Sequence, residues 1–333
     1  MEKTNKYDDI RGFNETKKFN SQEYSVEDIF NYSFNNNTIL IGSENIQKDV
    51  MEKGLNPGLG IRKLHEQGIT GKNIAAAIID QNVLLNHPEF KGKIIEYYDT
   101  GCNQDSNSGS MHGPAVVSLF VGNRMGTAPD TKVYYAAVPS WKADSRYYAE
   151  GLEWIINKNK TLNKEDKIRV VSVSAAPSGY DVFKNQELWI EAVKKAQEEG
   201  ILVIDCTNDK KTGFIGSVYY DLDDPDNITK CKSGYPNNEF NLRNNRIGAP
   251  SSRRTVAEEY VEGKPGYTYW GVGGQSWAIP YAAGVLCLGW QINPNLLPDE
   301  IVNLLHKTCY IDENNNKIIN PPKFIEEVNK TVV

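Results

Sequence analysis

The sequence lacks long hydrophobic runs and has no excess of basic residues. No apolar run approaches the roughly 18 residues that span a bilayer as a helix, and residues 1–9 contain no apolar core of a secretory signal. The 37 Lys and Arg residues are outnumbered by 43 Asp and Glu residues, which gives a formal net charge of -6 at pH 7. Proteins that bind nucleic acids need a basic surface to neutralise phosphates. We therefore expect a cytoplasmic protein with no membrane or nucleic-acid partner.

Cysteine and histidine are also scarce. The 5 cysteines form no C-x-x-C pair and the 4 histidines are scattered, so neither a disulfide framework nor a zinc site is predicted. The acidic residues within 221–226 are of a type that binds calcium, but a solvated loop is the favoured interpretation. We expect reduced thiols, no metal and no cofactor.

The composition divides the chain into two regions. Residues 1–54 are rich in Asn, Lys, Glu and Tyr, which indicates an N-terminal extension. In residues 55–333, short apolar runs alternate with helical patterns, which is typical of βαβ units around a mostly parallel sheet. The clearest unit has strands at 170–174 and 201–204 joined by a helix at 186–199. We predict an α/β fold for this second region.

Polar residues follow several of the predicted strands directly. Parallel strands carry their ligand sites at their carboxyl ends. Asp80 ends an apolar run at 74–79, Ser174 ends the next run, and residues 205–209 follow the third. These are the positions where we expect chemistry.

Two further stretches contribute an imidazole and a hydroxyl. His112 begins a helix-like run, and Ser276 opens a helix of small residues that follows the loop-rich stretch 209–274. A serine needs an adjacent imidazole to take its proton and a buried carboxylate to orient that imidazole. A serine at a helix N-terminus also gains free backbone N–H groups for an oxyanion. Asp80, His112 and Ser276 therefore form a candidate catalytic triad.

The surrounding motifs resemble those of the subtilisin-like serine proteases, the subtilase family, in family order. The resemblance covers about residues 55–328 and includes G-I-R-K-L-H-E-Q-G-I-T-G-K-N at 60–73, G-T-A-P at 126–129, G-L-E-W at 151–154, I-G-A-P at 247–250 and I-N-P at 292–294. It implies a three-layer α/β fold whose mostly parallel central sheet is flanked by helices.

The resemblance also implies roles for individual residues. Asp80 matches the triad carboxylate, His112 the general base, Ser276 the nucleophile and Asn208 the side-chain oxyanion donor. Asp209 matches a pocket-rim position where an acid favours a basic P1 side chain. The remaining matches are the substrate-backbone edge, Ser174, Ala175 and Ala176, and the S1 wall, Asp205, Cys206 and Thr207.

Each catalytic motif departs from the family pattern. D-Q-N at 80–82 replaces D-T-G, H-G-P-A at 112–115 replaces H-G-T-H, and G-Q-S-W at 274–277 replaces G-T-S-M. Because Gln275 and Trp277 flank the nucleophile, we expect a reshaped oxyanion site and S1 mouth. The loop that carries a tight calcium site in secreted relatives is missing, so no calcium is predicted there.

One apolar stretch in the extension, residues 38–42, has two interpretations. It is either a pro-segment strand laid along the substrate groove, by addition to a sheet edge, or an ordinary packing strand. The first interpretation makes residues 1–54 a short pro-segment in contact with the active-site groove.

The predicted function is an intracellular serine endopeptidase acting on a peptide or protein. The altered neighbours of the triad support an alternative, a pseudoprotease that binds a peptide or partner protein without cleaving it. Retention of every triad group and of Asn208 favours the enzyme. A third reading is a dedicated processing peptidase, which differs in the breadth of its substrates.

Overall fold

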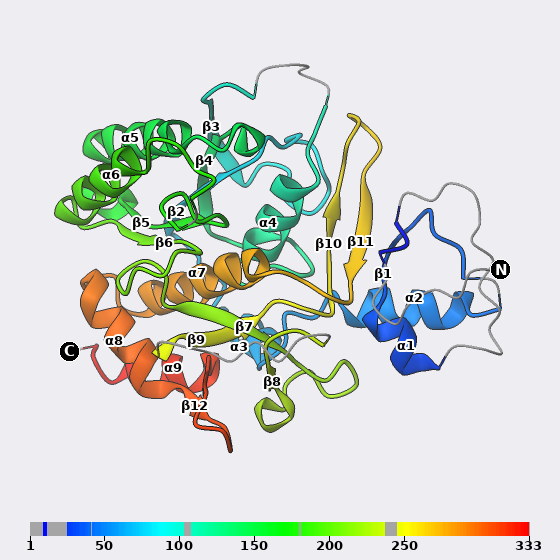
Figure 1. Ribbon diagram of the computed structural model, residues 1–333. Helices are drawn as coiled ribbons and strands as arrows, with labels where there is room; N and C mark the ends of the chain where they lie inside the picture. Colours follow the sequence, from blue (N-terminus) through cyan, green and yellow to red (C-terminus); the bar gives the residue numbers. More distant parts are fainter. Residues whose placement is uncertain are drawn as a thin grey trace.

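The computed structural model describes residues 9–11, 25–40, 42–102, 108–179, 181–236 and 245–332. Figure 1 shows a large α/β body and, beside strands β10 and β11, a smaller layer formed by the N-terminal part of the chain. The smaller layer contains α1 (Val26–Asn31), β1 (Ser33–Asn35) and α2 (Glu44–Lys53). The next helix, α3 (Ile61–Glu66), belongs to the body, where it contacts α9 (Pro321–Asn329).

A five-stranded parallel sheet forms the centre of the body. The strand order is β3-β4-β2-β5-β6, and every neighbouring pair is parallel. Its strands are β2 (Ala75–Asp80), β3 (Ile94–Asp99), β4 (Lys132–Ala137), β5 (Ile168–Val173) and β6 (Leu202–Ile204). The strands predicted at 74–79, 170–174 and 201–204 are thus confirmed.

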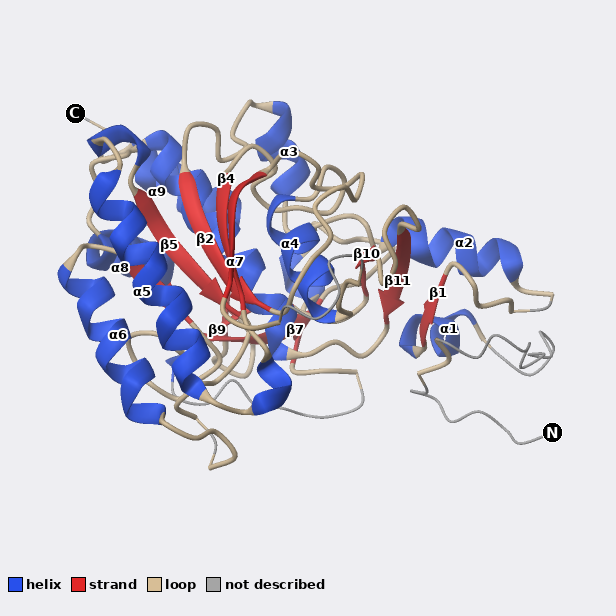
Figure 2. Ribbon diagram, turned by 90° about the horizontal axis from the view of Figure 1, so that it is seen from above, coloured by secondary structure: helices blue, strands red, loops and turns tan. Residues whose placement is uncertain are grey.

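Helices cover both faces of this sheet (Figure 2). Ala75, Ala77 and Ile79 pack toward α5 (Ser145–Thr161) and α6 (Gln186–Glu198), whereas Ala76 and Ile78 belong to the core on the opposite side. That core contains α4 (His112–Val121) and α7 (Gln275–Ile292). Side chains alternate across a strand, so a strand that is apolar at every position must be covered on both faces. The predicted three-layer fold is confirmed.

A second, mixed sheet packs against α7 and was not predicted. Its order is β12-β13-β9-β7-β8, with β9 parallel to both β7 and β13. The described part of residues 209–274, which the sequence indicated to be mostly loop, contains five strands. The sequence pattern missed them because they are short and several carry buried polar residues. The strands of this second sheet are β7 (Ile215–Tyr219), β8 (Lys232–Ser233), β9 (Ile247–Pro250), β12 (Tyr310–Ile311) and β13 (Lys317–Ile318). The helices of the C-terminal part of the chain are α8 (Pro298–Thr308) and α9 (Pro321–Asn329).

A third sheet joins the N-terminal layer to the body. β1 pairs antiparallel with β11 (Gly266–Trp270), and β11 pairs with β10 (Arg254–Glu258). Phe34 and Val50 of the layer are fully buried in the same core as α4 and α7. The part of the chain that the structure describes also has three short 3-10 helices: η1 (Ser140–Lys142), η2 (Lys164–Asp166) and η3 (Ile228–Lys230).

The predicted strand at 38–42 is wrong. Residues 38–40 have no regular structure, Ile41 lies outside the described residues, and Gly42 sits in a turn with φ 82°. The backbone there is bonded by a side chain instead: Gln47 Nε2 donates to Thr38 O at 2.7 Å, and Leu40 N donates to Gln47 Oε1 at 3.1 Å. A satisfied backbone has no need of a sheet partner.

Across the described ranges, no helix is both long and apolar enough to cross a membrane. The cysteines are all free thiols, and Cys102, Cys231 and Cys287 are buried. Burial raises the pKa of Cys287 to about 12, which keeps this thiol protonated and unreactive near neutral pH.

Candidate active site

Three elements converge on the candidate triad. Asp80 is the last residue of β2, His112 is the first residue of α4, and Ser276 is the second residue of α7. Asp80 is only 5% exposed, while His112 and Ser276 are partly exposed. The strand end and two helix N-termini therefore bring a buried carboxylate next to groups that a ligand can reach.

Asp80 and His112 form a short hydrogen bond. His112 Nδ1 lies 2.7 Å from Asp80 Oδ1, which also accepts the backbone N–H of Gln81 at 2.7 Å. Burial by itself lowers the pKa of His112, but the charge of Asp80 and the hydrogen bond outweigh burial, so the pKa lies above its usual value of 6.5. The pair therefore holds the Nδ1–H tautomer, which leaves the Nε2 lone pair free to accept a proton.

Ser276 is bonded to the end of the neighbouring strand. Its Oγ donates to Ser174 O at 3.1 Å, and Ser174 Oγ donates in return to Ser276 O at 2.8 Å. The second bond exists because Pro280, four residues along α7, has no N–H for the Ser276 carbonyl. Among the described residues, no hydrogen bond joins Ser276 to His112.

The two altered neighbours of Ser276 have defined contacts. The Trp277 ring is 4% exposed and lies 5.0 Å from the His112 ring, centroid to centroid, while Gln275 Nε2 donates to Ile215 O at 2.8 Å. Neither side chain lines the pocket described below. Trp277 packs on the imidazole of His112, and Gln275 attaches the start of α7 to β7. A reshaped oxyanion site and S1 mouth stays a prediction.

Asn208 follows β6 and is exposed, with its amide held from one side. Its Oδ1 accepts a hydrogen bond from Arg246 Nη2 at 3.0 Å, and the same Nη2 donates to Thr207 O at 2.6 Å. The carbonyl end of the amide is thus occupied, and Nδ2 is left as a donor. Sequence reasoning missed Arg246; the available signal was a charged residue immediately before the buried apolar strand β9.

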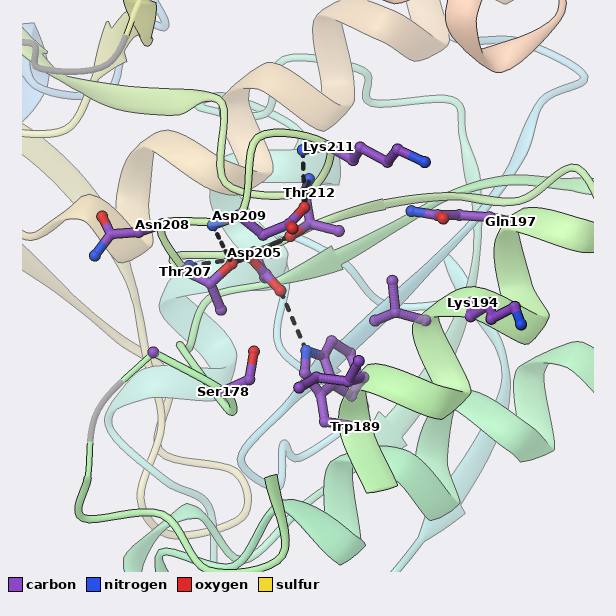
Figure 3. A pocket seen from close by; sticks show the side chains of 13 residues that line it. Ser178, Trp189, Lys194, Gln197, Asp205, Thr207, Asn208, Asp209, Lys211 and Thr212 are labelled. Carbon is purple, nitrogen blue, oxygen red and sulfur yellow. Dashed lines mark hydrogen bonds between the residues drawn. The ribbon is translucent and has the colours of Figure 1, made fainter. Parts of the chain in front are cut away.

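A pocket of about 520 Å³ opens beside Asn208 (Figure 3). One wall is α6, with Trp189, and the opposite wall is the loop that follows β6. Of the predicted substrate-binding residues, Asp205, Thr207 and Asp209 line it, while Ser174, Ala175, Ala176 and Cys206 do not. Cys206 N donates to Ala175 O at 2.8 Å, so these two segments pack together next to the pocket.

The two acids of the pocket are held by their own loop. Asp205 Oδ1 accepts from Thr207 Oγ1 at 2.5 Å and Thr212 Oγ1 at 2.9 Å, and its Oδ2 accepts from Trp189 Nε1 at 3.2 Å. Burial raises the pKa of Asp205 despite these donors. Asp209 Oδ1 accepts two backbone N–H groups, and its side chain reaches solvent. Of the two, Asp209 is the carboxylate open to a ligand.

The described ranges contain no group of three His, Cys, Asp or Glu side chains placed to hold a metal ion. In the acidic loop, Asp221 and Asp224 pair with Lys230 at 3.4 and 2.9 Å. The ammonium group of Lys230 therefore already balances the charge of these two carboxylates.

The protein family of this chain follows from its match to a known family. A model described as the subtilase family matches residues 71–238, half of the chain, and this span includes Asp80, His112 and Asn208. The chain belongs to the subtilase family. Ser276 lies beyond the matched span, so its assignment depends on the motif and on the geometry above.

The curated relatives of this subtilase are distant in sequence. Subtilisin NAT from Bacillus subtilis subsp. natto is 24% identical over 255 residues, 74% of this chain and 63% of that protein. The major intracellular serine protease of Bacillus subtilis strain 168 is 26% identical over 240 residues, 67% of this chain and 70% of its own. The match thus spans less than two thirds of subtilisin NAT.

Solved structures agree on the fold. The prenylagaramide maturation protease PagA superimposes with a TM-score of 0.58 at 20% identity, over 81% of this chain and 98% of its own. At this identity the likeness establishes the subtilase fold alone.

Proposed function

We propose that this subtilase is a serine peptidase in which Asp80, His112 and Ser276 form the catalytic triad. The observation that carries the proposal is the 2.7 Å bond between Asp80 and His112, made where α4 and the N-terminus of α7 meet. A buried carboxylate on Nδ1 is what a general-base histidine requires. Family membership supports the same reaction class.

The proposed reaction begins when Ser276 Oγ exchanges its bond to Ser174 O for one to His112 Nε2. His112 takes the hydroxyl proton as Oγ attacks the carbonyl carbon of the scissile peptide, and Asp80 stabilises the imidazolium. The protonated His112 then gives its proton to the leaving amine. Water attacks the resulting acyl-enzyme ester, again with His112 as base, and restores Ser276.

Two donors serve the oxyanion of the tetrahedral intermediate in this proposal. One is Asn208 Nδ2, whose carbonyl end is bonded to Arg246. The other is the backbone N–H of Ser276, one of the first N–H groups of α7 that have no partner inside the helix. Donors fixed in advance at a developing charge supply much of the rate enhancement of such sites.

The pocket beside Asn208 is proposed to hold the P1 side chain. Its position next to the oxyanion donor and its volume support this assignment. The exposed carboxylate of Asp209 at its rim favours a basic P1 residue. Ser174, Ala175 and Ala176, together with Cys206, would then form the edge along which the substrate backbone lies.

A dedicated processing role and a cytoplasmic location are the finer parts of the proposal. The fold neighbour PagA is named a maturation protease, and one relative is named an intracellular serine protease. Such a peptidase cleaves one class of precursor and leaves unstructured proteins intact. A panel of unfolded proteins separates the two cases, because rapid degradation of the whole panel contradicts a dedicated role.

The N-terminal extension is proposed to brace the histidine. Arg11 lies 3.8 Å from the centroid of Trp270, which is 5.9 Å from Trp277, which in turn contacts His112. Residues 1–54 then act as a retained part of the active protein, and residues 55–333 as its catalytic domain. Intact mass of the active enzyme tests this: loss of the extension during activation would make it a pro-segment.

A pseudoprotease is the second candidate, favoured by the bond of Ser276 Oγ to Ser174 O in place of His112. Labelling with a fluorophosphonate probe distinguishes the two. We expect the wild type to be labelled and both Ser276→Ala and His112→Ala to remain unlabelled. A folded wild-type protein that takes up no probe would refute the peptidase and leave the binding role.

A further inference from the structure

A buried arginine lies directly behind the oxyanion donor. Arg246 immediately precedes β9 and is 6% exposed. Its Nη2 donates both to Asn208 Oδ1 at 3.0 Å and to the backbone carbonyl of Thr207 at 2.6 Å. A guanidinium is costly to bury, so a buried one is expected to have a definite task.

We infer that Arg246 is a positioning residue that fixes the orientation of the Asn208 amide for oxyanion binding. The inference deepens the proposed function and rests on it, since it assigns no reaction of its own. Arg246 does not contact the substrate in this scheme; it acts through Asn208.

The chemistry of the two groups dictates which way the amide points. An asparagine amide has a carbonyl oxygen that accepts and an NH₂ that donates, and a rotation of 180° exchanges them. A guanidinium only donates, so it binds Oδ1 and repels NH₂. With Oδ1 held by Arg246, Nδ2 points away from the arginine and is available as a donor.

The same arginine also fixes the backbone that carries Asn208. Its bond to Thr207 O holds the preceding peptide from one side, while Thr207 Oγ1 is bonded to Asp205 on the other. Asn208 itself is exposed and would otherwise choose its rotamer freely. The charge on Arg246 further polarises the amide and strengthens Nδ2–H as a donor.

A kinetic cycle tests whether Arg246 acts through Asn208. We expect Asn208→Ala to lower kcat by about 100- to 1000-fold, as for loss of one oxyanion donor. Arg246→Met is expected to lower kcat by about 10- to 100-fold, the range of a charge-assisted hydrogen bond, with KM within about twofold. The double variant is expected to match Asn208→Ala alone, because an absent amide needs no positioning.

The conservative and neutral substitutions refine the cycle. Arg246→Lys keeps a charged donor and is expected to retain more kcat than Arg246→Met, and Arg246→Gln keeps a donor without the charge. Arg124→Met is the matched control: Arg124 is a surface guanidinium bonded to Glu89 and is expected to leave kcat unchanged. Near-ultraviolet circular dichroism establishes that each variant is folded.

Two failures are distinguishable. If the wild type and Ser276→Ala react equally with the fluorophosphonate probe, the proposed function fails. The second failure requires an active wild type and a lower kcat in Asn208→Ala. The role of Arg246 is then overturned if Arg246→Met has an unchanged kcat. It is also overturned if the loss of kcat in the double variant equals the product of the losses in the two single variants. Should Arg246→Met fail to fold, the Arg246→Lys and Arg246→Gln variants carry the same cycle with Asn208→Ala.

Discussion

The α/β body and the N-terminal layer are built by different means. In the body, β2 is apolar up to Asp80 and buried at every position, and helices cover both of its faces. In the layer, β1 is a three-residue strand, and much of the structure depends on polar side chains such as Gln47, Asn35 and Arg253. The body is thus held mainly by apolar packing, whereas the layer combines a small apolar centre with several buried or part-buried side-chain hydrogen bonds.

The largest expected effect separates catalysis from stability within the body. Ser276→Ala removes the proposed nucleophile and is expected to lower kcat on the order of 10⁶-fold, or about 8 kcal/mol of transition-state stabilisation. Its Oγ makes one hydrogen bond, so the melting temperature is expected to change little. Peptidase assays and calorimetry measure both quantities. A variant that retains even a hundredth of the activity would remove Ser276 from the proposed mechanism.

The next effect concerns the Asp80–His112 pair. Asp80→Asn preserves the shape but stabilises the wrong tautomer of His112, so kcat near pH 7 is expected to fall by about 10⁴-fold. In the wild type, His112 must be neutral to act as base, so kcat/KM is expected to rise with pH up to the raised pKa of His112 and then level.

The midpoint of this pH profile checks the electrostatic origin of the shift. Loss of the Asp80 charge is expected to move the midpoint to lower pH, because burial alone lowers the pKa of His112. An unmoved midpoint in Asp80→Asn would show that another group controls the profile.

A smaller effect tests the apolar centre of the N-terminal layer. Phe34 is fully buried and its ring centroid lies 5.0 Å from that of Tyr269, so Phe34→Ala is expected to destabilise the protein by about 3–5 kcal/mol. Ile39 lies in the same segment but is half exposed, and Ile39→Ala is the control, with an expected change below about 1 kcal/mol. Equal losses in urea denaturation would mean that the layer is not anchored through Phe34.

The smallest effect tests the polar side chains. Gln47→Ala removes both bonds to residues 38 and 40 and is expected to cost about 1–3 kcal/mol. Asn45→Ala, at an exposed position of the same helix, serves as the control. Hydrogen exchange of the Leu40 amide gives a local readout, since it is expected to accelerate only in the Gln47 variant. Equal exchange rates in both variants would refute this role of Gln47.

The same contrast explains what the sequence could predict. The strands and helices that carry Asp80, His112 and Ser276 have apolar patterns long enough to identify, and their motifs agree with the family. β10 carries Arg254 and Glu258 in buried positions, so its pattern resembles a loop. Hydrophobic pattern identifies elements that bury apolar surface and overlooks those that bury satisfied polar groups.

The site shows the same division at the level of single residues. The pairing of Asp80 with His112 could be predicted because each residue lies at the end of a patterned element and within a family motif. The contact of Arg246 with Asn208 could not be predicted, because it joins two residues 38 positions apart in the sequence and no local pattern encodes it. The positions of Gln275 and Trp277 likewise followed from their neighbours in space, β7 and His112.

The contact of Trp277 with His112 also makes the site observable by light. A protonated imidazole quenches the fluorescence of an adjacent indole more strongly than a neutral one does. Trp277 emission is therefore expected to brighten as His112 loses its proton, with the difference spectrum against Trp277→Phe isolating this signal from the other tryptophans. The protein thus contains an intrinsic probe of the protonation state of His112 that needs neither a substrate nor a label.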